Sequence, residues 1–130
     1  MKLLLDTHIW LWALLDPGRL SPAVRAALSS GENELWLSPI SVWEALLLAE
    51  GGRVHVETAP AEWVERMVQA LPRREAALTH DIAIASRLLT LSHEDPADRF
   101  LAATAQVLGL TLVTADARLI ASTEYAVMPN

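Results

Sequence analysis

Residues 93–105 read HEDPADRFLAATA, and this segment predicts a helix that begins among acidic side chains. Asp95 fits the N-cap position and Pro96 the first helical position, which places Asp98 in the first turn. Apolar residues then recur at the spacing of one helical face, at Ala97, Phe100, Leu101, Ala105 and Leu108. Capping needs only one carboxylate, and we assign it to Asp95. Asp98 is therefore left near a helix N-terminus, available to hold a metal ion.

Short apolar runs alternate with helical segments along the rest of the chain. We expect buried strands at 2–5, 34–37, 76–79 and 110–113, an extended segment at 53–57 and an edge strand at 125–128. We expect helices at 7–15, 23–30, 38–50, 58–71, 80–91, 95–108 and 117–121. This alternation predicts an α/β fold with a parallel sheet and right-handed crossovers. With 130 residues and no repeat or linker, the sequence predicts a single domain over residues 1–130.

The composition excludes several classes of protein. The chain is 52% hydrophobic, which is too apolar for a disordered protein. It has no cysteine, so disulfide frameworks, cysteine zinc sites and thiol nucleophiles are excluded, and the composition suits a reducing cytoplasm. No segment predicts a signal peptide or a membrane span, and we expect a cytoplasmic protein without membrane contact. The net charge of −6 argues against a simple cationic nucleic-acid binder, but bound divalent cations would offset part of it.

Four acidic residues share a position just after a predicted strand or near the start of a predicted helix. They are Asp6, Glu44, Asp98 and Asp116. Each has a structural alternative, since Asp6 and Asp116 fit helix N-caps. Ser38 or Ser41 fits the cap of the helix that carries Glu44, and the spacing from Ser41 to Glu44 is that of a capping box. On this segment alone, capping is favoured over catalysis for Glu44.

The shared position of the four acids points beyond capping. In a parallel sheet the carboxyl ends of the strands meet at one edge, where open α/β sheets place their sites. Four carboxylates in one crevice would repel one another unless cations were bound. Oxygen ligands without cysteine favour Mg²⁺ or Mn²⁺, and such ions suit hydrolysis of a phosphodiester. The residues leave open whether one ion binds or two.

Other residues carry expectations about packing. Trp10 and Trp12 lie two positions apart on a predicted helix, so we expect both to be incompletely buried and one to face a partner. We expect Trp43, Leu46 and Leu47 to form a buried helical stripe that Leu48 extends. Arg99 is expected to pair, on the helix surface, with the N-cap carboxylate four residues before it.

Four segments, in order along the chain, resemble the PIN domain, and more narrowly the VapC-like toxin ribonucleases of bacterial type II toxin–antitoxin systems. They are LLLDTH at 3–8, SVWE at 41–44, HEDPADR at 93–99 and TAD at 114–116. The resemblance covers essentially the whole chain. The first and third segments together are specific, whereas either alone would be weaker.

The resemblance implies a three-layer α/β/α fold with a mainly parallel central sheet, and metal-dependent endoribonuclease activity. It assigns catalysis and metal binding to Asp6, Glu44, Asp98 and Asp116. It makes Asp6 and Asp98 the firmest Mg²⁺ ligands and implies that Thr7 and Thr114 order the site by hydrogen bonding. It also implies an RNA substrate, a homodimer, and a small antitoxin whose C-terminal segment enters the site.

Three other functions compete with this one. A PIN fold retained as a catalytically silent RNA- or partner-binding module would be supported by loss of one acid, and all four are present. A phosphatase with Asp6 as nucleophile typically needs an acid two residues later and a basic residue near the phosphate. Position 8 is His8, and the only lysine is Lys2. A phosphoacceptor signalling domain would need a lysine after the last strand, which this chain lacks.

Overall fold

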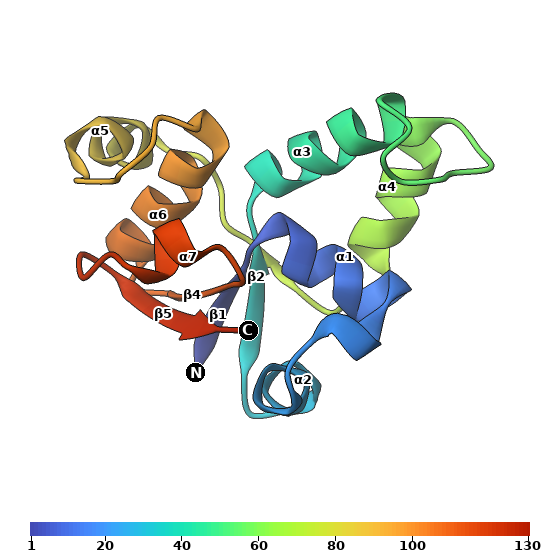
Figure 1. The fold of residues 1–130 in the computed structure, drawn as a ribbon, viewed down its shortest axis with the longest axis horizontal. Helices are drawn as coiled ribbons and strands as arrows, with labels where there is room; N and C mark the ends of the chain where they lie inside the picture. The colour runs from blue at the N-terminus through green and yellow to red at the C-terminus, as the bar shows by residue number, and fades with distance from the viewer.

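Five short strands form one sheet in which every neighbouring pair is parallel, in the order β3-β2-β1-β4-β5 (Figure 1). The computed structural model describes residues 1–130. The strands are β1 (Lys2–Leu5), β2 (Glu34–Leu37), β3 (Arg74–Glu75), β4 (Thr111–Thr114) and β5 (Ala126–Pro129). The helices are α1 (Thr7–Leu15), α2 (Pro22–Ser29), α3 (Pro39–Glu50), α4 (Pro60–Gln69), α5 (His80–Leu88), α6 (Pro96–Leu108) and α7 (Ala117–Ile120), with a 3-10 helix η1 (Pro17–Arg19). The parallel α/β fold expected from the sequence is confirmed.

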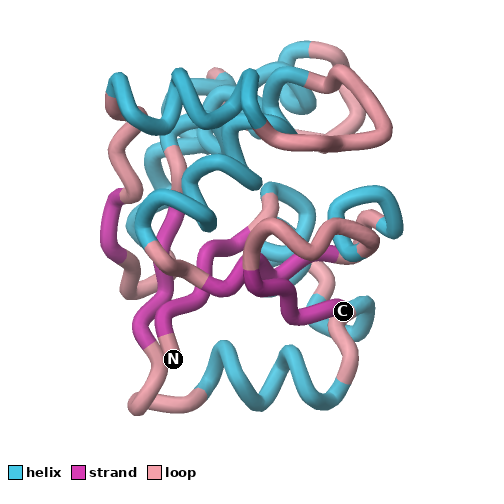
Figure 2. Tube along the Cα trace, turned by 90° about the vertical axis from the view of Figure 1, so that its left-hand side faces the viewer, coloured by secondary structure: helices cyan, strands magenta, loops and turns pink.

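The central strand β1 explains the three layers. Its residues Leu3, Leu4 and Leu5 are at most 1% exposed, and successive side chains of a strand point to opposite faces of the sheet. Leu3 and Leu5 pack into a core with α1 to α4, whereas Leu4 packs into a second core with α5, α6 and α7. Helices therefore cover both faces of the sheet, as Figure 2 shows, and the expected α/β/α layering is confirmed.

Several helices begin where the sequence supplies a cap. Ser21, Ser38 and Asp95 each accept a backbone N–H of the helix that follows, and each precedes a proline at the first helical position. Gly109 ends α6 in the left-handed region, at φ 66°, which glycine adopts without a steric penalty. None of the helices combines the length and the apolar character needed to cross a membrane.

The third strand lies earlier than expected. The prediction placed it at 76–79, but the paired residues are Arg74 and Glu75. The N–H of Ala76 still donates to the carbonyl of Leu37 at 2.9 Å. The side chain of Thr79 then caps α5, which turns the chain away from the sheet. The extended segment expected at 53–57 forms no strand, and α5 ends at position 88 rather than 91.

Two expectations about tryptophan packing are wrong. Trp43 and Leu47 are 50% and 46% exposed, because the small residues of α3 face the core instead. Leu46 and Leu48 are half-buried and pack against the core, so that part of the predicted stripe is confirmed. Trp10 is 1% exposed, and its indole N–H donates to the carbonyl of Met67 at 3.3 Å. That hydrogen bond removes the cost of burying the indole nitrogen. Trp12 is half-buried, as expected.

We predict that Asp95→Ala lowers the free energy of unfolding by about 1 kcal/mol, the usual cost of a lost N-cap. The Asp95 carboxylate accepts the backbone N–H groups of Ala97 and Asp98 at 3.0 and 3.3 Å, and alanine cannot replace it. Urea denaturation measures the change. Asp95→Asn keeps a capping oxygen and is the control, expected close to wild type. An unfolding free energy unchanged in the alanine variant would contradict the assignment.

Candidate active site

Asp6 directly follows β1, and both of its carboxylate oxygens accept hydrogen bonds. Oδ1 accepts the backbone N–H of Thr7 at 2.8 Å, so Asp6 is the N-cap of α1. Oδ2 accepts the hydroxyl of Thr114 at 2.6 Å, from the last residue of the neighbouring strand β4. Burial raises the pKa of Asp6, and these hydrogen bonds oppose the shift only in part. Each oxygen retains a further lone pair, so capping and metal binding are compatible at this residue.

Glu44 lies in the second turn of α3, outside any capping box. Ser38, not Ser41, is the N-cap of this helix, so the capping role that the sequence favoured for Glu44 is wrong. The Glu44 carboxylate instead accepts a hydrogen bond from the hydroxyl of Thr7, at the start of α1. Burial raises the pKa of Glu44 to about 7, and the nearby Asp6 carboxylate adds to the shift.

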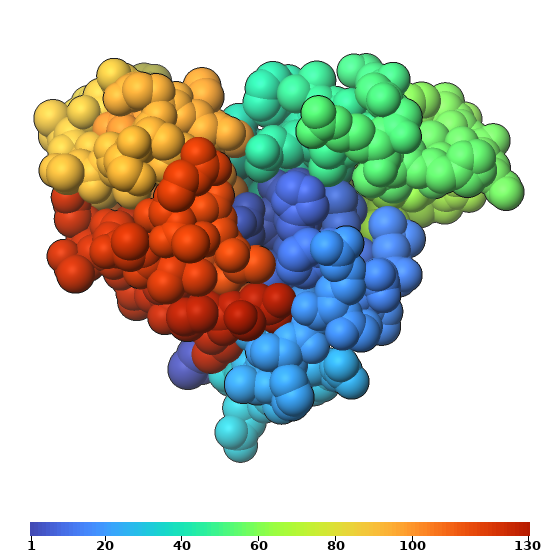
Figure 3. All heavy atoms as spheres, viewed as in Figure 1, coloured from blue at the N-terminus to red at the C-terminus, as the bar shows by residue number.

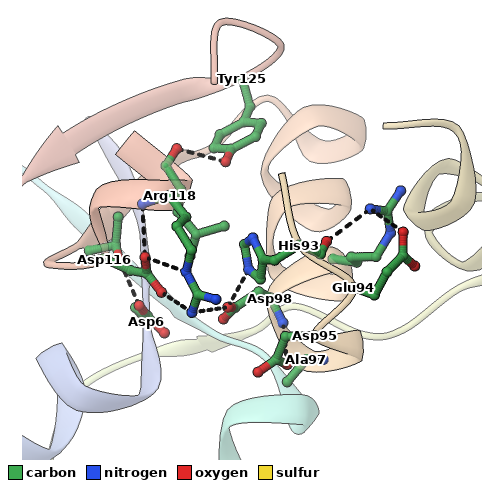
Figure 4. A network of polar contacts seen from close by, with 12 residues as sticks. Asp6, His93, Glu94, Asp95, Ala97, Asp98, Asp116, Arg118 and Tyr125 are labelled. Carbon is green, nitrogen blue, oxygen red and sulfur yellow. Dashed lines mark hydrogen bonds and ion pairs between the residues drawn. The ribbon is translucent and has the colours of Figure 1, made fainter. Parts of the chain in front are cut away.

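Asp98 is held from two sides at the start of α6. Its backbone N–H donates to Asp95, and its Oδ2 lies 2.8 Å from Nε2 of His93 (Figure 4). The side chains of His93 and Asp98 are only 10% and 11% exposed. Burial raises the pKa of Asp98, and the hydrogen bond to His93 acts in the opposite direction. The hydrogen bonds confirm that Asp95 caps α6, whereas metal binding by Asp98 stays a prediction.

Arg99 holds the loop that carries His93. We expected Arg99 to pair with the N-cap carboxylate on the helix surface, and this expectation is wrong. Arg99 is only 5% exposed and lies between α5 and α6. Its guanidinium donates to the carbonyls of Ser86, Leu89 and His93 at 2.8, 2.6 and 3.3 Å. These bonds satisfy carbonyls near the end of α5 and fix the backbone from which the His93 ring reaches Asp98. No local pattern could identify these partners, because they lie in another helix and a loop.

Arg118 was not singled out in the sequence, yet it is the cation nearest the acidic side chains. Its Nε and a terminal guanidinium nitrogen lie 3.3 and 3.0 Å from the two carboxylate oxygens of Asp116 (Figure 4). The same terminal nitrogen lies 3.8 Å from Oδ2 of Asp98. The hydrogen bond to Arg118 lowers the pKa of Asp116, opposite to the shifts of the three more buried acids. The only sequence signal was its place two residues after an N-cap acid.

The four acidic side chains line one crevice at the carboxyl edge of the sheet. Asp6 and Asp116 enter it from the ends of β1 and β4, Glu44 from α3 and Asp98 from α6. The opposite wall of the crevice includes three side chains that carry no carboxylate: His8, Trp12 and Arg19. Figure 3 shows the surface hollowed where the N-terminal, central and C-terminal segments meet. The sheet thus brings together carboxylates that are far apart in the sequence.

The side chains in the crevice fit a divalent cation. His93, Asp98 and Asp116 each offer a ligand atom, and these atoms all lie within 4.8 Å of one another. This group combines a nitrogen of His93, for which the sequence predicted only a local hydrogen bond, with Asp98 and Asp116. It does not contain Asp6 or Glu44. Several buried carboxylates with raised pKa values, close to one another, are the electrostatic condition that a bound cation relieves.

Comparisons with known proteins agree on the fold and on a family. Residues 3–123 match the family model of the PIN domain. The chain is 35% identical over 117 residues to Ribonuclease VapC22 of Mycobacterium tuberculosis, an alignment that covers 89% of this chain and 88% of that protein.

Two solved structures share the fold. One is VapBC2 from Rickettsia felis bound to a promoter DNA fragment, with a TM-score of 0.71, 13% identity, and coverage of 99% of this chain and 98% of that one. The other is a toxin–antitoxin complex from Klebsiella pneumoniae, with a TM-score of 0.61, 23% identity, and coverage of 95% and 98%. At these identities the likeness establishes the arrangement of the elements rather than the chemistry.

We predict that, without divalent ions, the chain loses stability as pH rises from about 5 to about 7.5. The pKa of Glu44 is about 7 in the folded chain, against an ordinary value of 4.5. The folded state therefore binds more protons than the unfolded state in this range, and stability falls with increasing pH. The raised pKa values of Asp6 and Asp98 act in the same direction. Thermal unfolding in EDTA, followed across this pH range, measures the effect.

The Glu44→Gln variant lacks the carboxyl group that titrates at this position. The melting temperature of this variant is therefore expected to fall less steeply with pH than that of the wild type. Addition of Mg²⁺ at about pH 7.5 is expected to raise the melting temperature of the wild type. A wild-type melting temperature that rises over this range would contradict the prediction.

Proposed function

Because the chain belongs to the PIN-domain family, we propose that it is a metal-dependent endoribonuclease that hydrolyses RNA phosphodiester bonds, and the toxin of a type II toxin–antitoxin system. One observation carries the proposal: carboxylates from four separate segments line one crevice. The relative named Ribonuclease VapC22 supports an RNA substrate. RNA is made in the cytoplasm of bacteria, so we place the activity there.

The proposed metal ligands, which are also the proposed catalytic residues, are Asp6, Glu44, Asp98 and Asp116. The ion is Mg²⁺ or Mn²⁺, since carboxylate oxygens suit both. When bound, such an ion would lower the pKa of a coordinated water and would offset negative charge on the leaving oxygen.

The chain itself fixes the geometry of these carboxylates. Thr114 and Thr7 donate hydroxyl hydrogen bonds to Asp6 and Glu44, which restricts both side chains to one arrangement before any substrate binds. Thr7 and Thr114 are therefore proposed to support the site without contacting the reacting atoms. Arg118, half-exposed beside Asp116, presents a guanidinium suited to a phosphate oxygen of the RNA.

A catalytically silent binding module is the second candidate. Such a module would not need all four metal-binding carboxylates, and its binding would be unaffected by replacement of Asp98. The complete set of acids in the crevice, together with the hydrogen bonds that order them, favours the enzyme.

We predict that Asp98→Asn lowers RNA cleavage by at least about 100-fold and leaves the chain folded, because the amide keeps the shape of the side chain but loses the charge that the ion needs. The assay is cleavage of mixed cellular RNA by purified chain without antitoxin, with Mg²⁺, with Mn²⁺ and with EDTA. Asp6→Asn is expected to behave alike.

Asp81→Asn is the matched control. Asp81 also lies in the first turn of a helix, α5, but it is exposed and outside the crevice, so cleavage is expected to be unchanged. Cleavage that persists in EDTA, or in the Asp98→Asn chain, would refute the assignment of the site. A folded wild type that binds metal but cuts no RNA would favour the silent module.

Two protein partners complete the proposal. We propose a small antitoxin, supported by the shared fold with the Klebsiella pneumoniae toxin–antitoxin complex. We also propose a homodimer. Two large apolar side chains of α5 support it, since Ile84 and Leu88 lie one helical turn apart and are 61% and 77% exposed.

We predict that Leu88→Glu, at a position that a dimer through α5 would bury, shifts the chain from dimer to monomer, because a charge buried without a partner destabilises an interface. Light scattering coupled to size-exclusion chromatography measures the mass. The matched control is Leu15→Glu, which alters an exposed leucine of α1 that is 52% exposed. A wild-type chain that is monomeric at all concentrations tested would disprove the dimer.

A further inference from the structure

The wall of the crevice opposite Asp98 is built from His8, Trp12 and Arg19, and the proposed hydrolysis uses none of them. We propose that the stacked pair of Trp12 and Arg19 is a subsite for an unpaired nucleobase of the RNA, beside the phosphate to be cut. This inference rests on the proposed function and adds to it the residues that would contact a base of the RNA.

The guanidinium of Arg19 lies over the Trp12 ring, and both residues line the crevice. The guanidinium carbon of Arg19 lies 4.5 Å from the centroid of the Trp12 ring. Arg19 is exposed and makes no ion pair, although acidic side chains line the same crevice. His8, one turn before Trp12 on α1, adds a second ring with its centroid 5.8 Å away. A guanidinium without an ion pair and two rings therefore line the crevice in which the proposed RNA would lie.

The ring of Trp12 and the backbone that carries Arg19 are held in place before any ligand binds. Trp12 is half-buried, and part of its ring packs against the core beneath α1. The backbone of Arg19 belongs to η1, and its carbonyl accepts a hydrogen bond from the side-chain amide of Asn130 at 3.0 Å. The oxygen of the same amide accepts the N–H of Ser21 at 2.7 Å. A surface held from both sides loses little freedom when it binds a flat group.

A nucleobase matches this chemistry. Unpaired bases stack on aromatic side chains and on arginine planes, and the contact is tolerant of sequence because every base has a π-face. Arg19 on this wall and Arg118 on the other give two positive groups beside an acidic floor. A backbone phosphate between them would be attracted from both sides, and the base next to it would reach Trp12. A base within a duplex is already stacked on its neighbours and cannot enter.

The test measures affinity rather than cleavage. The Asp98→Asn chain, with Mg²⁺, is titrated into a fluorescein-labelled, unstructured RNA of about 12 nucleotides, and fluorescence anisotropy gives the dissociation constant. Trp12→Leu in this background is expected to weaken binding roughly tenfold or more, the range found when a stacked base loses its aromatic partner. Trp12→Phe keeps a ring and is expected to restore most of the affinity. The same RNA annealed to its complement is expected to bind much more weakly.

Two further variants separate stacking from folding and from charge. Arg19→Lys keeps the charge and loses the plane, and since Arg19 is exposed this variant is expected to fold and still bind at least threefold more weakly. Trp43→Leu and Arg53→Ala alter an exposed tryptophan and an exposed arginine outside the crevice, and are expected to change nothing. The melting temperature of each variant is measured beside its titration. If Trp12→Leu does not fold, the affinity of the Arg19→Lys variant decides whether the subsite exists.

Unchanged affinity in both Trp12→Leu and Arg19→Lys would overturn the subsite, as would equal affinity for single-stranded and duplex RNA. Cleavage by the wild-type chain in that case would leave the ribonuclease intact. A wild type that cuts no RNA, with affinity lost in both variants, would instead overturn the ribonuclease and keep the base subsite.

Discussion

The structure depends on the hydrogen bonds of one buried carboxylate, Asp6. It accepts the first N–H of α1 with one oxygen and the Thr114 hydroxyl with the other. The first bond sets where α1 leaves the sheet, and the second ties the ends of β1 and β4 together. Thr7, whose N–H completes the cap, also donates its hydroxyl to Glu44 of α3. One acid therefore organises two strands and two helices around the crevice.

This arrangement has an electrostatic cost. Burial raises the pKa values of Asp6, Glu44 and Asp98, which means that the folded chain resists ionisation of the groups a cation would need. Arg118 lowers the pKa of Asp116 and offsets part of the negative charge in the ion-free protein. The chain contributes two exposed guanidinium groups to the crevice, those of Arg118 and Arg19, so the rest of the balancing charge would come from bound cations.

The two sides of the crevice differ in character. The side formed by α6 and α7 carries carboxylates with their fixed partners, supported by the buried Arg99. The side formed by α1 and η1 carries rings and a guanidinium that makes no ion pair. An acidic floor suits an ion that meets the phosphate, and a flat wall suits the base attached to it. The division between them is consistent with one substrate that is both charged and aromatic.

The sequence by itself determined the layers of the fold, the helix that starts at Asp95, and the acids that line the crevice. These depend on spacing along the chain: apolar runs, a cap followed by proline, and acids after strands. Only the tertiary structure decided that Glu44 pairs with Thr7, that Arg99 is buried, and that Arg19 lies on Trp12. The physical reason is that each of these side chains finds its partner in another element. Which partner it meets is set by how the helices pack on the sheet, and no local pattern records that packing.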